Sequence, residues 1–136
     1  MALTLLHTIN NPNAHAESLI GDTFGESAAI SGNYAIVGAP FEDSSAEDVD
    51  QGKAYIFDVT TGLLVHTLDN PNVYAYTQIN DQFGYNVGIS GNYAIVGARY
   101  EDSVNIEDNQ GKAYIFDVTT GLLVHTLTTL MRLQIR

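Results

Sequence analysis

The chain has 136 residues and a formal net charge of −11, because 16 acidic side chains face only 5 lysines and arginines. This balance argues against a nucleic-acid-binding surface and against binding to anionic membranes, since both need clustered cations. The absence of cysteine excludes disulfides and thiolate metal sites, and without tryptophan the strongest stacking platform for sugars and quinones is missing. No apolar stretch approaches the roughly 20 residues of a membrane-spanning helix.

The sequence repeats itself at an offset of 59 residues. QGKAYIFDVTTGLLVHTL occupies residues 51–68 and recurs, letter for letter, at 110–127. ISGNYAIVGA likewise occupies 30–39 and 89–98. A fixed period of this size is typical of propellers, solenoids and arrays, in which each unit buries its apolar faces against its neighbours. The first functional question is therefore what this chain stacks on.

The repeat also divides the chain. LLHTI at residues 5–9 is an earlier copy of the LVHTL that begins at Leu64, so we interpret the N-terminus as a strand and not as a secretory signal. The expected units are a last strand of a preceding blade at 1–10, blade repeats at 11–69 and 70–128, and a non-repeat tail at 129–136.

Each repeat contains four strand-like runs separated by turn residues, as in a blade of antiparallel sheet. YAIVGA is apolar on both faces and predicts an interior strand. Glycine and asparagine supply the positive φ of the first hairpin, and Thr-Thr-Gly forms the last turn. No helical period is sustained in either repeat, so the predicted fold is all-β. In the first repeat the expected strands are Phe24–Ser31, Tyr34–Ala39, Lys53–Val59 and Leu63–Leu68.

Short motifs in both repeats resemble a known family. Phe24-Gly25 followed by Gly38-Ala39-Pro40 resembles the FG-GAP repeat of integrin α-subunit β-propellers and of many bacterial surface proteins. The second copy keeps Phe83-Gly84 and Gly97-Ala98 but has Arg99 in place of the proline. The run GKAYIFDVTTGLLVHTL is also similar to the strand-turn-strand of quinoprotein-type propellers. The resemblance implies tandem four-stranded blades of a β-propeller, and an extracellular or cell-surface location.

The family's calcium loop, D-x-D-x-D-G-x-x-D between FG and GAP, has no counterpart here, because residues 26–37 read ESAAISGNYAIV. The remaining metal candidates lie in the acidic loops before Gly52 and Gly111, since calcium takes about six to eight oxygen ligands. A solvated loop is the simpler interpretation, because charge runs usually mark exposed surface. No cofactor is expected, with weak calcium binding by these loops left open. The candidate calcium ligands are Asp43, Asp48, Asp50, Asp102 and Asp108.

Three histidines, His7, His66 and His125, share one repeat position, and we expect cross-strand packing there rather than metal binding. Catalytic sites need different groups that meet once, whereas almost every polar candidate in this chain is duplicated. There is also no Gly-x-Ser-x-Gly elbow and no phosphate-binding glycine loop.

Repeated aspartates precede turns in both repeats. Asp58 and Asp117 stand before Val-Thr-Thr-Gly and are expected to accept backbone donors, and the same is expected of Asp22 and Asp81. Four tyrosines recur and predict core or blade-to-blade packing, namely Tyr34, Tyr55, Tyr93 and Tyr114. Four belong only to the second repeat and could form a contact patch, namely Tyr74, Tyr76, Tyr85 and Tyr100.

The sequence therefore predicts a non-enzymatic interaction module that mediates protein or glycan contacts and self-assembly. Exposed blade faces need partners. Either a longer propeller supplies them, or identical chains close a ring as a trimer or a tetramer. One alternative is a propeller enzyme, a hydrolase or quinone-dependent oxidoreductase, active only as a closed ring. Another is a calcium-stabilised scaffold.

Overall fold

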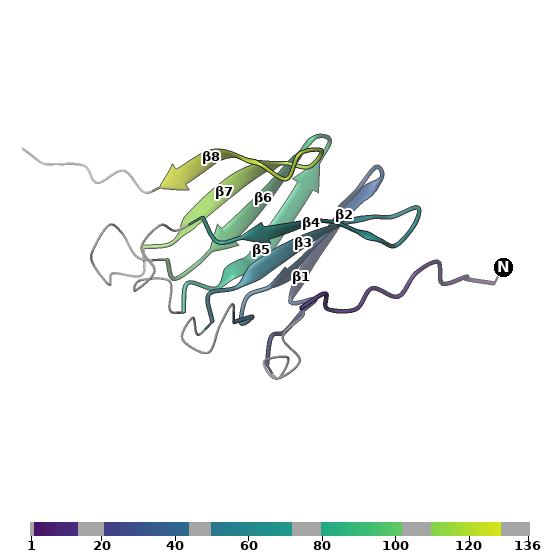
Figure 1. Cartoon of the computed structure of the whole chain (residues 1–136), viewed down its shortest axis with the longest axis horizontal. Coiled ribbons are helices and arrows are strands. Elements are labelled where there is room, and N and C mark those ends of the chain that lie inside the picture. The colour runs from purple at the N-terminus through teal and green to yellow at the C-terminus, as the bar shows by residue number, and fades with distance from the viewer. Residues whose placement is uncertain (1, 14–20, 44–49, 72–79, 102–109, 129–136) are drawn as a thin grey trace, which may run out of the picture.

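A computed structural model of the chain shows two antiparallel sheets of four strands each, with strand orders β1-β2-β3-β4 and β5-β6-β7-β8 (Figure 1). The structure describes residues 2–13, 21–43, 50–71, 80–101 and 110–128. Each sheet coincides with one sequence repeat, and we call the two sheets blade 1 and blade 2. The predicted all-β fold of two tandem blades is confirmed. The strands are β1 Ser27–Ser31, β2 Tyr34–Ala39, β3 Lys53–Asp58, β4 Leu64–Asp69, β5 Phe83–Ser90, β6 Tyr93–Ala98, β7 Lys112–Asp117 and β8 Leu123–Thr128.

Three of the four strands predicted for the first repeat match β2, β3 and β4 to within one residue. The predicted start of the first strand at Phe24 is wrong for blade 1. A tight turn occupies that stretch, where the Glu26 N–H donates to the Thr23 carbonyl at 2.9 Å and Thr23 has φ 54°. In blade 2 the strand does begin at Phe83, and its register with β6 shifts between Phe83 and Asn86.

The turn after β3 forms as predicted. Asp58 Oδ1 accepts the Thr60 N–H at 2.7 Å and the Thr61 N–H at 3.2 Å, and Asp117 does the same in blade 2. The hydrogen bonds from Thr60 lower the pKa of the Asp58 carboxyl, because they stabilise its charged form. Gly62 closes the turn with φ 73°. Local side-chain chemistry therefore fixes this hairpin in both blades.

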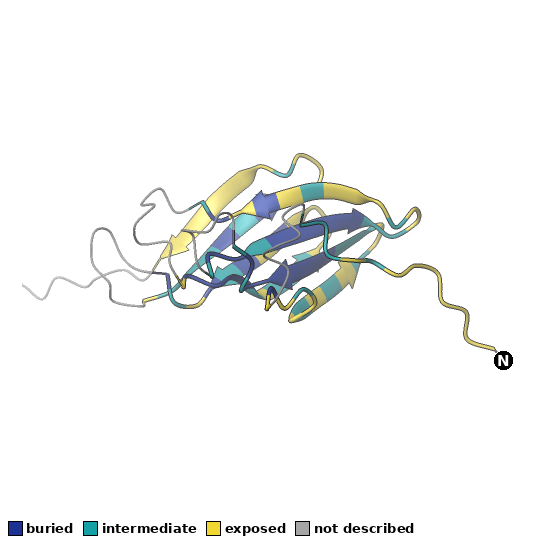
Figure 2. Cartoon of the chain, turned by 60° about the horizontal axis from the view of Figure 1, so that its bottom comes forward, coloured by how far each residue is buried: buried dark blue, intermediate teal, exposed yellow. Residues whose placement is uncertain are grey.

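The blades pack face to face, and each has two different faces. The forward face of blade 1 carries Ile36, Ile56 and Leu68, and it meets blade 2 in one continuous apolar core. The rear face of blade 1 carries Val37, Ala39, Tyr55 and Phe57 and lies on the opposite side of the same sheet. Blade 2 contributes its own rear face to the shared core, through Phe83, Ala94, Val96, Ala98, Tyr114 and Phe116. Burial is greatest in the interior strands such as β2 and β3, whereas β8 is exposed along its whole length (Figure 2).

Glycines allow the two backbones to approach closely at this junction. A Cβ added to Gly38 would lie 1.9 Å from the Gly84 carbonyl oxygen, and one added to Gly52 would lie 2.0 Å from the Phe83 carbonyl oxygen. Close approach lets the N–H groups of Gln82 and Phe83 each donate, at 3.0 Å, to carbonyls of blade 1. The FG and GAP elements are thus the two sides of one backbone contact between consecutive blades.

Replacing Gly38 by alanine should lower the free energy of unfolding by about 1–3 kcal/mol, because the new methyl group forces the blades apart. Gly97 is the same position of blade 2, where an added Cβ meets nothing closer than Asn86 O at 3.7 Å. The Gly97→Ala control should change the free energy of unfolding of the dilute protein by less than about 0.5 kcal/mol. Urea denaturation measures both. Equal losses in the two variants would contradict the assignment of the junction.

Candidate functional site

The forward face of blade 2 is an apolar surface that the fold leaves open. Ile95 is 42% exposed and Leu127 is 46% exposed, whereas Ile36 and Leu68, at the same repeat positions of blade 1, are 0% and 1% exposed. Tyr93 on this face is 56% exposed, contrary to the packed position predicted for it. The same residues are thus buried in blade 1 and exposed in blade 2, because a neighbouring blade covers this face only in blade 1.

Two shallow depressions of about 400 and 260 Å³ mark this open face. Tyr93, Ile95 and Ile115 line the larger one, while Asn86, Gly97 and Ala113 line the smaller one. The walls are apolar apart from Asn86 and Ser90. A surface of this kind gains free energy by leaving water, at roughly 25 cal/mol per Å² of apolar area. It is suited to a flat apolar partner.

One of the repeated histidines, His66, joins the two blades, in addition to lying opposite Ile56 in the cross-strand position predicted for it. His66 on β4 has Nε2 3.2 Å from the Thr119 carbonyl oxygen, in the last turn of blade 2. Its ring also fills the space beside Gly121, where an added Cβ would come within 2.7 Å of Nδ1. His125 holds the same position on β8 and is exposed, with no such contact among the described residues.

Residues 7–13 contact blade 1, and the chain before them runs outward from it (Figure 1). Residues 2–13 form no strand, contrary to the strand predicted for 1–10, because no described strand pairs with them. Their contacts nevertheless copy those of β4. His7 Nε2 lies 3.2 Å from the Thr60 carbonyl oxygen, and Ile9 packs on the rear-face cluster of Val37, Tyr55 and Phe57. The assignment of 1–10 to a preceding blade stays a prediction.

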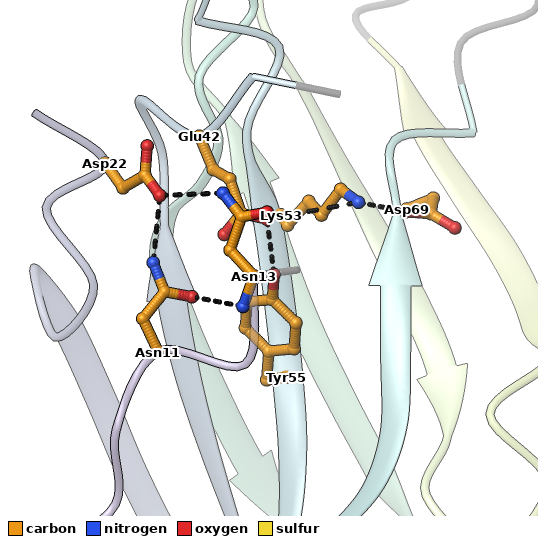
Figure 3. Close-up of polar contacts among 7 residues, drawn as sticks. All are labelled: Asn11, Asn13, Asp22, Glu42, Lys53, Tyr55 and Asp69. Carbon is orange, nitrogen blue, oxygen red and sulfur yellow. Dashed lines mark hydrogen bonds and ion pairs between the residues drawn. The ribbon is translucent and has the colours of Figure 1, made fainter. Parts of the chain in front are cut away.

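A network of polar side chains lies at the loop end of blade 1 (Figure 3). Asn11 and Asn13 donate to Asp22 Oδ2 at 2.9 and 3.0 Å, so Asp22 accepts side-chain amides rather than the backbone donors that we predicted. Asn70 donates to Asp81 in the same way, at 2.8 Å. These contacts tie the segment that leaves one blade to the loop that opens the next.

The second part of the network is a buried carboxyl. Glu42 is fully buried, accepts the Tyr55 hydroxyl at 2.5 Å and lies 3.9 Å from Lys53 Nζ. Burial raises the pKa of Glu42, and the Tyr55 hydrogen bond and Lys53 act against that rise. Burial and the bond to Glu42 raise the pKa of the Tyr55 phenol, which therefore stays a donor. The two groups form a polar pair inside the blade end.

Blade 2 repeats this pair, with Glu101 accepting the Tyr114 hydroxyl at 2.5 Å and lying 3.0 Å from Lys112 Nζ. The pair was not predicted from the sequence. Glu42-Asp43-Ser44 recurs as Glu101-Asp102-Ser103 while residues 45–50 differ from 104–109, and that recurrence was a usable signal. A feature that is duplicated and anchored by tyrosine and lysine within its own blade holds the loop in place. We assign it a structural role.

The acidic-loop calcium ligands stay a prediction. Asp48, Asp102 and Asp108 lie outside the described residues. Asp43 and Asp50 are neighbours, since Asp43 Oδ1 accepts the Asp50 N–H at 2.6 Å, and burial and the Asp43 charge raise the pKa of Asp50. Among the described residues, no group of three or more histidine, aspartate or glutamate side chains is placed to hold a metal ion.

One polar cluster occurs only in the second repeat. The Arg99 guanidinium lies 3.8 Å from the ring centroid of Tyr85 and 4.4 Å from that of Tyr100, and Arg99 Nε donates to Gln82 Oε1 at 2.8 Å. Each cation–π contact contributes about 0.5–1 kcal/mol at an exposed site. The second-repeat tyrosines thus gather in part, around the arginine that replaces the GAP proline. Tyr74 and Tyr76 lie outside the described residues.

The stability conferred by Glu42 should depend on pH. Its raised folded-state pKa means that the contribution is complete below the unfolded pKa and is lost as pH rises through the folded pKa. The difference in unfolding free energy between wild type and Glu42→Gln should therefore shrink from acid to neutral pH in a urea series. Asp58→Asn is the contrast, because the lowered pKa of Asp58 gives the opposite trend. A pH-independent difference for Glu42→Gln would refute the assignment.

The described part of the chain contains no helix with the length and hydrophobicity needed to cross a membrane. No curated protein matches the sequence significantly. Among solved structures, the chain is similar to the crystal structure of the computationally designed Ika8 protein, with 16% identity and a TM-score of 0.38. The match covers 76% of this chain and 36% of that one, so this chain spans little more than a third of that protein.

A family model for the FG-GAP repeat matches residues 17–57 and 77–116, one stretch in each blade. The two matches include the Phe-Gly and Gly-Ala elements that meet at the junction between the blades. Repeats of this family are generally protein-interaction modules and are typically non-enzymatic. The chain belongs to the FG-GAP repeat family.

Proposed function

We propose that this chain is a non-enzymatic protein-interaction module that binds through the forward face of blade 2. One observation carries the proposal: the apolar face whose Ile36, Ile56 and Leu68 are buried in blade 1 is repeated in blade 2 and left open there. Tyr93, Ile95 and Leu127 together form an exposed patch on a regular sheet, and such patches mark interaction sites. With the purified chain alone, binding through this face would be observed as self-association.

The chemistry of the face favours a protein partner over a glycan. Its depressions are lined by Ile95, Ile115 and glycines, with few groups that could pair with sugar hydroxyls. The polar residues that line them are Asn86, Ser90 and Tyr93, and none of these is charged. The face therefore offers area and shape rather than hydrogen bonds.

Replacing Ile95 by aspartate tests this function. The side chain is 42% exposed in the free chain, so the carboxylate stays hydrated there, but any apolar partner would bury it unpaired. Sedimentation velocity over a range of protein concentrations should show wild-type association weakened at least about tenfold in Ile95→Asp. Thr126→Asp is the control, because Thr126 is exposed on β8 and points away from the forward face.

Circular dichroism verifies that both variants keep the sheet. A wild-type chain that stays monomeric at every concentration, or an Ile95→Asp variant that associates like wild type, would contradict the proposed function.

A further inference from the structure

We infer that the partner of the open forward face is a second copy of this chain, docked through the rear face of its blade 1. The orientation is the one in which blade 2 already packs on blade 1, so the copies associate head to tail. This inference rests on the proposed interaction function and adds to it the partner and the register. Each contact proposed between two copies corresponds to a contact between blade 1 and blade 2 within one chain, which we call the internal junction.

Both sides of the junction are repeated in sequence. The rear face that fills the forward face of blade 1 includes Val96, Tyr114 and Phe116, and blade 1 carries the same residue types at the same repeat positions, Val37, Tyr55 and Phe57. The two forward faces match in the same way. The matched forward pairs are Tyr34 with Tyr93, Ile36 with Ile95, Ala54 with Ala113, Ile56 with Ile115 and Leu68 with Leu127. Each copy therefore offers one of each complementary face, as a heterologous interface requires.

The backbone contact can form again as well. Within the chain, Gly38 is in direct contact with Gly84, and the corresponding residues between two copies are Gly97 of one chain and Gly25 of the other. Both are unobstructed: an added Cβ at Gly25 meets nothing within 4 Å, and one at Gly97 meets nothing closer than 3.7 Å. The positions where blades must touch thus carry no side chain on either of the two faces.

Residues 2–10 occupy part of the site that the second copy needs. His7 Nε2 lies 3.2 Å from the Thr60 carbonyl oxygen, and His66 Nε2 lies at the same distance from that of Thr119. His125 of an incoming copy would therefore compete with His7 for the Thr60 carbonyl. Ile9 likewise sits in the rear-face cluster where Leu127 of that copy would pack. The segment buries little apolar surface on blade 1, because Leu3 is 98% exposed and Leu5 and Leu6 are also exposed. Docking displaces it, and the hydrogen bond from Asn11 to Asp22 can remain.

Engineered cysteines test this register in a chain that has none of its own. In the internal junction Ser27 Oγ lies 3.1 Å from Val87 N, which brings side chains at these two positions within reach of a disulfide. The corresponding positions between two copies are Asn86 and Ala28, both exposed in the free chain. An equimolar mixture of Asn86→Cys and Ala28→Cys chains in a glutathione buffer should form a mixed disulfide. Each variant alone should form far less dimer.

Asn86→Cys mixed with Thr61→Cys is the matched control, because Thr61 lies in the β3–β4 turn, at the other edge of blade 1. Adding Gly97→Ala to the Asn86→Cys chain should lower the mixed disulfide to the control level. Deleting residues 2–8 from the Ala28→Cys chain should increase its yield.

The result that overturns the inference is a mixed disulfide no more abundant than the control, or one that Gly97→Ala leaves unchanged. If wild-type chains still associate in sedimentation velocity, and Ile95→Asp still weakens that association, the proposed function stands and only the head-to-tail register fails. If wild-type chains do not associate at all, both fail.

Discussion

The structure depends on one constraint, the backbone contact between consecutive blades at Gly38 and Gly84. No side chain fits there, since a Cβ on Gly38 would lie 1.9 Å from a carbonyl oxygen. Glycine allows the sheets to come close enough for Ile36 and Phe83 to be buried in one core and for blade 2 to hydrogen bond to blade 1. The two blades therefore have the same design. The forward face of each blade becomes buried only when a following blade packs on it.

This rule separates the parts of the chain to which we assign a structural role from the face that we propose for binding. The Glu42–Tyr55 pair and the turn at Asp58 lie within one blade, recur in the other, and hold the loops and hairpins in shape. The open forward face is different, because its repeat equivalent is buried and its own neighbour is absent from the described residues. An apolar sheet face in this state gains free energy by leaving water, as the core does, and we therefore propose it as an interaction surface.

The sequence predicted the strands of each blade well, because hairpins at Gly32 and Gly62 and the alternation within KAYIFD are local properties. It predicted less where a neighbouring blade decides the outcome. The packing of His66 on Thr119, the exposure of Tyr93 and the lack of a strand in residues 2–10 all depend on which blade lies alongside, and a single repeat cannot report that. The burial of Glu42 was missed because the residue stands in an acidic loop that looked solvated.

Amide hydrogen exchange of the two YAIVGA strands, resolved by NMR, tests the central claim most directly. The strands β2 and β6 have the same sequence and the same interior place in their sheets, so they differ in whether a blade covers the forward face. In dilute solution β6 should exchange faster than β2, and raising the protein concentration should slow exchange in β6 until the two converge. Equal protection in dilute solution, or a difference that concentration does not change, would contradict the account.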